Sequence, residues 1–437
     1  MLKRIITIAL LTGAGQVFVV FALKYISQHS SAEQVKAIGQ IDSLVLFIMN
    51  IIALGLQPSA MRNLALTDDW KQEYSDTQSA RLTLSLLLAA LALLFFIDKY
   101  YIAFLIAPLL ALSGDYALYG RGLPVKGAIV ALARSIIPFL AVILLTNQNI
   151  DPSSLYLLSL VIIYFITDIF ISSFLKQSWL PDIRIDGLKK YLTTLPLGLV
   201  SLSLYFIGIG IILIAQYFYP SPTLAIAFIG LKFYVIYKGV LRILHQAFFK
   251  EMTSEQVCLK IDQLSIIAAL LFLSSVLIFP NSFIRFFFGE QYIDDKYFFI
   301  LLGISAFVYS VFLSMATRSM LEKKDNIYMK ITVASASLTI LLSILLSFFW
   351  KQSLSIAISI LAGELCWMFG LIAIGGSLHE IKTRIIFIIQ SSLPIILLIG
   401  SCYFFGDKLL NYFISFGIFA CLLLLLHSSK FKNLPIK

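Results

Sequence analysis

Long apolar runs recur from one end of this chain to the other, and they constrain its fold more than any other feature. A helix of about 20 apolar residues spans the hydrocarbon of a bilayer, where backbone N–H and C=O groups must be satisfied within the segment. Alternating apolar and polar strands of about 10 residues, which are typical of a membrane barrel, do not occur in the sequence. The chain is therefore predicted to be an all-α polytopic membrane protein.

The composition agrees with this prediction. Hydrophobic residues make up 60% of the 437 residues and charged residues only 13%, whereas about a quarter of a soluble chain is charged. We expect about fourteen transmembrane helices, of which the last two are an appendage to a core of twelve. The expected helices cover residues 5–27, 37–57, 82–97, 101–118, 127–145, 154–175, 191–217, 223–241, 261–279, 297–317, 329–350, 354–376, 385–405 and 411–427.

Lysine and arginine gather on one side of these helices. With the N-terminus in the cytoplasm, the cytoplasmic segments hold most of the 33 basic residues, among them Arg81, Lys238 and Arg384. Because cytoplasmic loops carry such an excess, both termini are predicted to be cytoplasmic. Segments 58–81, 176–190 and 238–260 would then face the cytoplasm, and 280–296 the outside. The net charge of +10 therefore reports topology, and no nucleic-acid partner is expected.

Sequence motifs for nucleotide or metal chemistry do not occur. The chain has no G-x-x-x-x-G-K-[ST] loop and no H-E-x-x-H pair, and its four histidines and four cysteines are scattered without metal-ligand spacing. No cofactor and no catalytic residues are expected. The first apolar stretch, preceded by Lys3 and Arg4, is too long for a signal peptide and lacks an A-x-A site, so it is expected to stay as a helix.

Two stretches resemble a known family. They are "GLQPSAMRNLA" at 55–65 and "FFFGEQYIDDKYFFILLGISAFVYSVF" at 286–312, with its FG-E-x-Y step. Both resemble polysaccharide flippases of the O-antigen type, in the MOP exporter superfamily, which also includes MATE transporters and lipid II flippases. The resemblance implies two six-helix bundles, 1–180 and 181–376, around a central cavity, and two additional helices within 377–437.

Four charges inside the expected helices are candidates for function, because a charge near the bilayer centre costs roughly 2.5 to 3.5 kcal/mol. They are Arg134, Asp168, Lys232 and Glu364. Arg134 shares a helical stripe with Gly127, Ala131, Pro138 and Ala141, and such small residues mark a helix contact or a cavity wall. Arg134 is therefore expected to point inward, either as a cavity residue or as the structural partner of Asp168.

These charges suggest roles in transport. An anionic substrate favours Arg134 and Lys232 as substrate-binding residues, with Arg62 and Lys24 as further candidates that also suit a role as interfacial anchors. Asp168 and Glu364 are candidates for ion coupling, because buried carboxylates often mark ion pathways.

The resemblance implies a flippase that carries an undecaprenyl-pyrophosphate-linked oligosaccharide across the bacterial inner membrane, by alternating access, for O-antigen-like or lipopolysaccharide synthesis. Its partners would be this lipid-linked oligosaccharide, membrane lipids and polysaccharide polymerase machinery. The alternative is a MATE-like, cation-coupled multidrug antiporter, for which the carboxylates Asp168 and Glu364 argue and the cations Arg134 and Lys232 do not. A membrane-embedded polymerase is disfavoured because the chain has no large outer loop.

Overall fold

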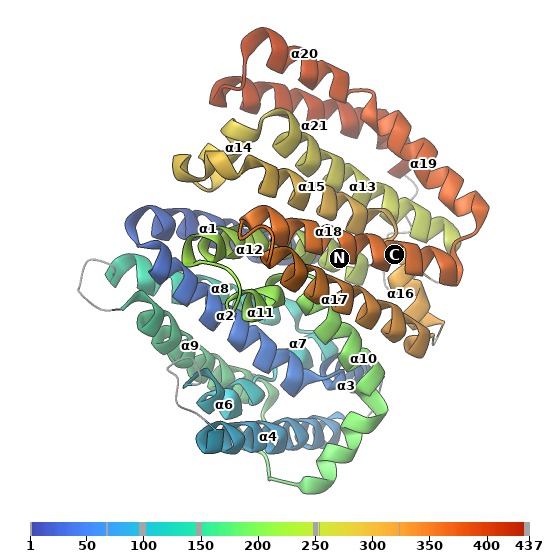
Figure 1. Cartoon of the computed structure of the whole chain (residues 1–437). Helices are drawn as coiled ribbons and strands as arrows, with labels where there is room; N and C mark the ends of the chain where they lie inside the picture. Colours follow the sequence, from blue (N-terminus) through green and yellow to red (C-terminus); the bar gives the residue numbers. More distant parts are fainter. Residues whose placement is uncertain are drawn as a thin grey trace. The chain divides into compact units, whose positions relative to one another are not determined.

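The computed structural model describes residues 2–66, 69–95, 102–145, 151–247, 252, 254–322 and 324–431, and every element of regular secondary structure in them is a helix (Figure 1). Within those residues, 9 helices are long and apolar enough to cross a membrane, or up to 11 if each of two bent pairs is one span. The predicted all-α polytopic fold is confirmed.

The chain forms two compact units, Met1–Tyr205 and Phe206–Lys437. In the first unit α1 packs against α8, α8 against α9, α3 against α7 and α4 against α6. The elements are α1 (Leu2–His29), α2 (Ala32–Ala53), α3 (Leu56–Leu66), α4 (Trp70–Phe95), α5 (Ile102–Leu105), α6 (Ala107–Ala111), α7 (Asp115–Gly120), α8 (Pro124–Leu145), α9 (Pro152–Leu175), η2 (Ile185–Leu188) and α10 (Lys189–Phe206).

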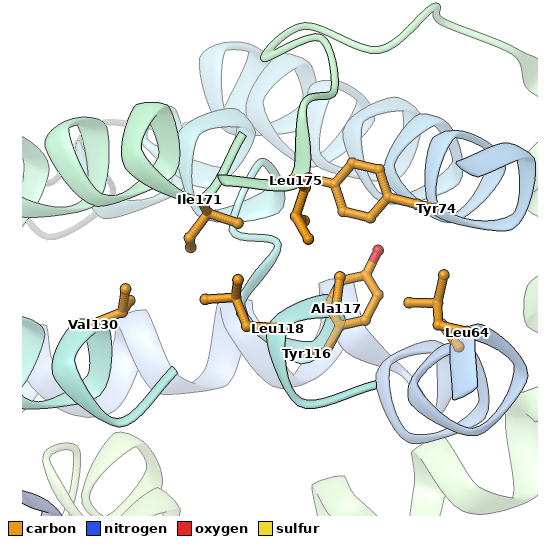
Figure 2. Close-up of a cluster of buried hydrophobic side chains, with 9 residues drawn as sticks. Leu64, Tyr74, Tyr116, Ala117, Leu118, Val130, Ile171 and Leu175 are labelled. Atoms are coloured by element: carbon orange, nitrogen blue, oxygen red, sulfur yellow. The ribbon is translucent and has the colours of Figure 1, made fainter. Parts of the chain in front are cut away.

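A buried apolar cluster holds five helices of the first unit together (Figure 2). Tyr116 and Leu118 of α7 lie at its centre, and side chains of α3, α4, α8 and α9 pack around them. Close van der Waals packing of this kind holds helices together inside a membrane. The cluster therefore fixes the short helix α7 beside α8 and α9. Its members are Ala60, Leu64, Tyr74, Tyr116, Ala117, Leu118, Val130, Ile171 and Leu175.

In the second unit α17 packs against α18, α15 against both α13 and α18, and the last helices against α13. The functional division into 1–180, 181–376 and 377–437 stays a prediction. The elements are η3 (Ile209–Ile211), α11 (Ile212–Ala215), α12 (Ser221–Ala247), α13 (Glu255–Ile278), α14 (Pro280–Phe287), η5 (Glu290–Asp295), α15 (Lys296–Val311), α16 (Leu313–Leu321), α17 (Asp325–Ser347), α18 (Ser353–Gly375), α19 (Leu378–Ser392), α20 (Ile395–Phe405) and α21 (Leu409–Phe431).

One predicted span is broken in the structure. The apolar run at 101–118 was expected to be a single helix, but its described part forms α5, α6 and α7, with residues 112–114 between the last two outside any helix. Gly114 meets the ring of Tyr74 so closely that an added Cβ would lie 2.5 Å from the Tyr74 hydroxyl. The average hydropathy of this run does not reveal the helix break at residues 112–114, because Ser113 and Gly114 are only mildly polar.

A second difference concerns the segment 58–81, which was expected to be a loop. The structure places α3 and the first turns of α4 there, and α4 begins at Trp70 rather than at 82. Residues 70–81 are mostly polar although they are helical, so a search for apolar runs does not identify this part of α4. The run at 191–217 is also divided, because α10 ends at Phe206 and η3 begins at Ile209.

Candidate functional site

Arg134 lies inside α8 and pairs with Asp168 of α9. Its Nη2 donates to Asp168 Oδ1 over 2.6 Å. The Arg134 side chain is 8% exposed and that of Asp168 is 0% exposed. The inward orientation predicted from the small-residue stripe is therefore observed, and of the two roles left open for Arg134 the structure shows an ion pair.

Further contacts hold the guanidinium of Arg134 in one orientation. Its Nε donates to Thr167 Oγ1 over 2.9 Å, and its Nη1 donates to Ser113 Oγ over 2.5 Å. The ring of Tyr164 lies 4.1 Å from the guanidinium carbon, a cation–π contact. These bonds use three of the five N–H groups of an arginine, one on each nitrogen.

A second buried arginine, Arg81 of α4, binds the same serine. Arg81 Nη1 donates to the Ser113 carbonyl oxygen over 2.5 Å and to Gln78 Oε1 over 3.1 Å. The residue is 3% exposed and lies within α4, so the prediction that it belongs to a loop is wrong. Ser113 therefore joins two arginines, Arg81 through its carbonyl and Arg134 through its hydroxyl.

The helix break at 112–114 explains why polar side chains gather here. A helix end leaves carbonyl groups without partners, and in a membrane protein such groups must be satisfied by the protein or by water. Gln78 Nε2 donates to the Leu112 carbonyl over 2.7 Å, and Arg81 binds the next carbonyl. Asp115 Oδ1 in turn accepts from Ser113 Oγ over 3.3 Å. We call Arg81, Ser113, Arg134 and Asp168 the first-unit charge cluster.

The second unit contains a comparable pair, Lys238 of α12 and Glu364 of α18. Lys238 Nζ forms an ion pair with Glu364 Oε1, and the Tyr234 hydroxyl donates to the same oxygen over 2.5 Å. Lys238 Nζ also lies 4.6 Å from the Tyr234 ring centre and 4.5 Å from that of Tyr309. Lys238 was predicted to lie in a cytoplasmic loop, and the structure corrects this, because the residue is 7% exposed within α12.

The other candidate cations take different positions. Lys232 lies in α12 and is half-buried, but the lysine that pairs with Glu364 is Lys238. Lys24 is half-buried in α1, where its carbonyl oxygen accepts from Ser27 Oγ over 2.8 Å. Arg62 belongs to α3, but its side chain lies outside the described residues.

A third buried network connects α13, α16 and α19. Arg384 of α19 donates through Nη2 to Asp262 Oδ2 of α13 over 2.7 Å, and both side chains are 0% exposed. The hydroxyl and backbone N–H of Ser314 also donate to Asp262, over 2.6 Å and 2.9 Å, so both carboxylate oxygens have partners. Arg384 was expected in a loop, and the structure instead buries it as a link between helices.

The two earlier carboxylates each keep one oxygen without a partner. Among the described residues, Asp168 Oδ2 and Glu364 Oε2 are buried and accept no hydrogen bond. A buried polar atom without a partner is unfavourable. Asp168 and Glu364 differ in this respect from Asp262, whose two oxygens both accept hydrogen bonds.

Comparisons with known proteins agree with the membrane fold. No protein-family model and no curated protein sequence matches the chain. Among solved structures, the lipid II flippase MurJ in an inward closed conformation is similar with a TM-score of 0.74 and 15% identity, over 98% of both chains. A MATE in the bent conformation is similar with a TM-score of 0.52 and 13% identity, over 88% of this chain and 96% of that one.

A MATE in complex with MaL6 is also similar, with a TM-score of 0.53 and 12% identity, over 87% of this chain and 96% of that one. The chain therefore has the fold seen in the lipid II flippase MurJ and in MATE proteins, two groups that the sequence resemblance also named.

Proposed function

We propose that this protein is a flippase that moves an undecaprenyl-pyrophosphate-linked oligosaccharide from the inner to the outer leaflet of the bacterial inner membrane. The fold similarity to a flippase of a lipid-linked precursor supports this proposal. The observation that carries it is the first-unit charge cluster, in which Arg81 and Arg134 are both held inside an apolar helix bundle by the broken segment at Ser113.

The chemistry of the cargo explains the need for such charges. A pyrophosphate is costly to transfer into hydrocarbon, and fixed cations offset the loss of its hydration. Arginine keeps its charge when it is desolvated, and its planar fork suits phosphate oxygens. Arg134 is therefore the leading substrate-binding residue, and Lys232, Arg62 and Lys24 are further candidates for contacting the anionic part of the cargo.

The ion pairs suggest how transport is coupled to an ion. While Asp168 is ionised, it holds Arg134 in the pair. A proton or sodium ion bound at the unpartnered Oδ2 neutralises the carboxylate, and the guanidinium of Arg134 is then released for an anion. Glu364 and Lys238 repeat this arrangement in the second unit. Cation binding and anion binding at each cluster are thereby linked.

The finer assignments belong to the same proposal. Both termini and the segments 58–81, 176–190 and 238–260 face the cytoplasm, and 280–296 faces outward. The bundles 1–180 and 181–376 act as the moving parts, with the helices of 377–437 as an addition. The exported glycan passes to polysaccharide polymerase machinery for O-antigen-like or lipopolysaccharide synthesis.

A deletion strain tests the function. Loss of the protein is expected to deplete surface polysaccharide and to leave lipid-linked glycan on the inner leaflet. The leaflet is measured in spheroplasts, where an impermeant glycosidase reaches only glycan on the outer leaflet. Unchanged surface glycan in the deletion strain would contradict the proposal.

A MATE-like antiporter for organic cations is the second candidate, and the unpartnered oxygens of Asp168 and Glu364 favour it. Deletion would then leave surface glycan intact and make the cells sensitive to cationic dyes. Measuring both glycan and dye sensitivity in one deletion strain separates the two functions.

A further inference from the structure

A polar pocket of about 220 Å³ lies within the first unit, between α3, α4 and α10. Its polar lining comes from all three helices: Ser59, Asn63, Glu73, Thr77, Lys190, Thr193 and Thr194. Lys190 Nζ lies 3.1 Å from Glu73 Oε2, and Asn63 Nδ2 donates to Glu73 Oε1 over 3.3 Å. These contacts connect the three helices around the opening and hold the lining in place.

The charges in this pocket favour a neutral ligand. Lys190 is paired with Glu73 and lies 3.8 Å from Asp76 as well, so no net positive charge is left for a phosphate. Phosphate recognition uses clustered, uncompensated cations instead. An organic cation would meet the ammonium of Lys190. Among the described residues there is also no group of three His, Cys, Asp or Glu side chains that could hold a metal ion.

One buried hydroxyl in the pocket lining has no hydrogen-bond partner among the described residues. Thr77 lines the pocket, is 1% exposed, and its Oγ1 has no hydrogen-bond partner in the described structure. A buried hydroxyl without a partner is unfavourable, and a ligand hydroxyl would satisfy it. Leu56 and Ala60 add an apolar patch to the same lining, which suits the C–H face of a sugar ring.

The size of the pocket limits the ligand to one small group. At about 30 Å³ for each water molecule, the volume corresponds to roughly seven waters. It falls below the range of about 300–1,000 Å³ that is common for pockets of drug-sized ligands. A single sugar ring suits this space, whereas a whole oligosaccharide does not.

We propose that this pocket binds one neutral sugar residue of the lipid-linked glycan. This inference rests on the proposed function, since the pocket lies beside segments 58–81 and 176–190, which are predicted to face the cytoplasm, where the cargo is loaded. The pocket recognises the sugar, and the first-unit charge cluster recognises the pyrophosphate. The two recognition tasks thus fall to separate places in the first unit.

A cysteine at position 59 reports occupancy of the pocket directly. The first 205 residues contain no cysteine, so Ser59→Cys introduces the single thiol of that unit. The purified full-length variant is treated with methyl methanethiosulfonate, and labelling of the peptide containing residue 59 is followed by mass spectrometry. Glucose, galactose, mannose, rhamnose, N-acetylglucosamine and N-acetylgalactosamine are each added at rising concentration. At least one of them is expected to slow labelling in a saturable way.

Two control variants make this result specific. Ser178→Cys places the same thiol at an exposed position of the first unit, outside the pocket, and its labelling is expected to stay unchanged with sugar. Thr77→Val in the Ser59→Cys background keeps the side-chain shape and removes the unpartnered hydroxyl. Protection by sugar should then weaken about fivefold, while the melting temperature without sugar stays equal or rises. Thr383→Val, the same substitution at a half-buried position in α19 outside the pocket, should leave the protection by sugar unchanged.

Several results would overturn the inference. They are protection by none of the six sugars, equal protection at positions 59 and 178, protection by inorganic phosphate or tetraethylammonium instead of a sugar, and undiminished protection in Thr77→Val. The proposed function is tested separately. Loss of glycan export on deletion without sugar protection would refute the pocket alone, and protection in a protein that moves no lipid-linked glycan would refute the flippase alone.

Discussion

Arg134 binds one oxygen of Asp168 over 2.6 Å, and the other oxygen of that carboxylate, although buried, has no hydrogen-bond partner in the described structure. The pair thus combines a strong contact with an unused acceptor. Asp262 has partners for both of its oxygens. On the proposed function, the Arg134–Asp168 pair exchanges partners during transport, whereas the Arg384–Asp262 pair only joins helices.

The first prediction concerns the stability of the Arg134–Asp168 pair. Arg134→Ala should destabilise the protein by about 3–5 kcal/mol, because it leaves a buried carboxylate without its cation. Arg134→Ala combined with Asp168→Ala should regain most of the folded protein, measured as detergent-stable monodisperse material by fluorescence-detected size exclusion. Lys189→Ala, which breaks an exposed pair with Asp186, serves as the control and should leave the folded amount unchanged.

Export by the same variants tests the role of Arg134 in substrate binding. If Arg134 holds the pyrophosphate, the double variant should fold but export little glycan. Arg134→Lys should keep part of the export, since charge returns without the bidentate geometry. Full export by the double variant would show that Arg134 serves only to pair with Asp168, and the substrate role would be wrong.

The second prediction concerns ion coupling. Asp168→Asn and Glu364→Gln keep the side-chain shapes but remove the group that takes up a proton or a sodium ion. In proteoliposomes, flipping of a fluorescent lipid-linked glycan should lose its dependence on an imposed proton or sodium gradient in at least one variant. If both variants flip the glycan at the same rate as the unchanged protein at every imposed gradient, the carboxylates are structural.

The third prediction distinguishes two lysines of α12. Lys238→Met should lower the melting temperature strongly, because Glu364 would lose its cation in a fully buried place. Lys232→Met, the same substitution on a half-buried lysine of the same helix, should have a smaller effect. Adding Glu364→Gln to Lys238→Met should recover part of the loss, since Tyr234 still donates to the remaining oxygen. An equal loss in both single variants would contradict the assignment of the pair.

The fourth prediction concerns topology. Ser178→Cys and Asp294→Cys place exposed thiols in the segments predicted to face the cytoplasm and the outside, respectively. In intact spheroplasts a membrane-impermeant maleimide should label position 294 and not position 178. After permeabilisation it should label both positions. The reverse pattern would invert the orientation of the whole chain.

Sequence alone determined the fold class, because hydrocarbon allows long apolar runs only one regular solution, the helix. It also determined which way Arg134 faces, since a stripe of small residues on one helix is visible from local spacing. The Asp168 partner followed as one of two alternatives, because both residues belong to neighbouring helices of the chain.

Tertiary structure decided the remaining members of the site. Lys238 and Glu364 are 126 residues apart, and nothing in local spacing connects them. Arg81 and Arg384 each stand at the polar end of an apolar run and were therefore expected in loops, but helix packing buries both. The break at Ser113 is held open by side chains of α4 and α8. Local patterns reveal the face on which a charge lies, but its partner depends on which distant helix packs against that face.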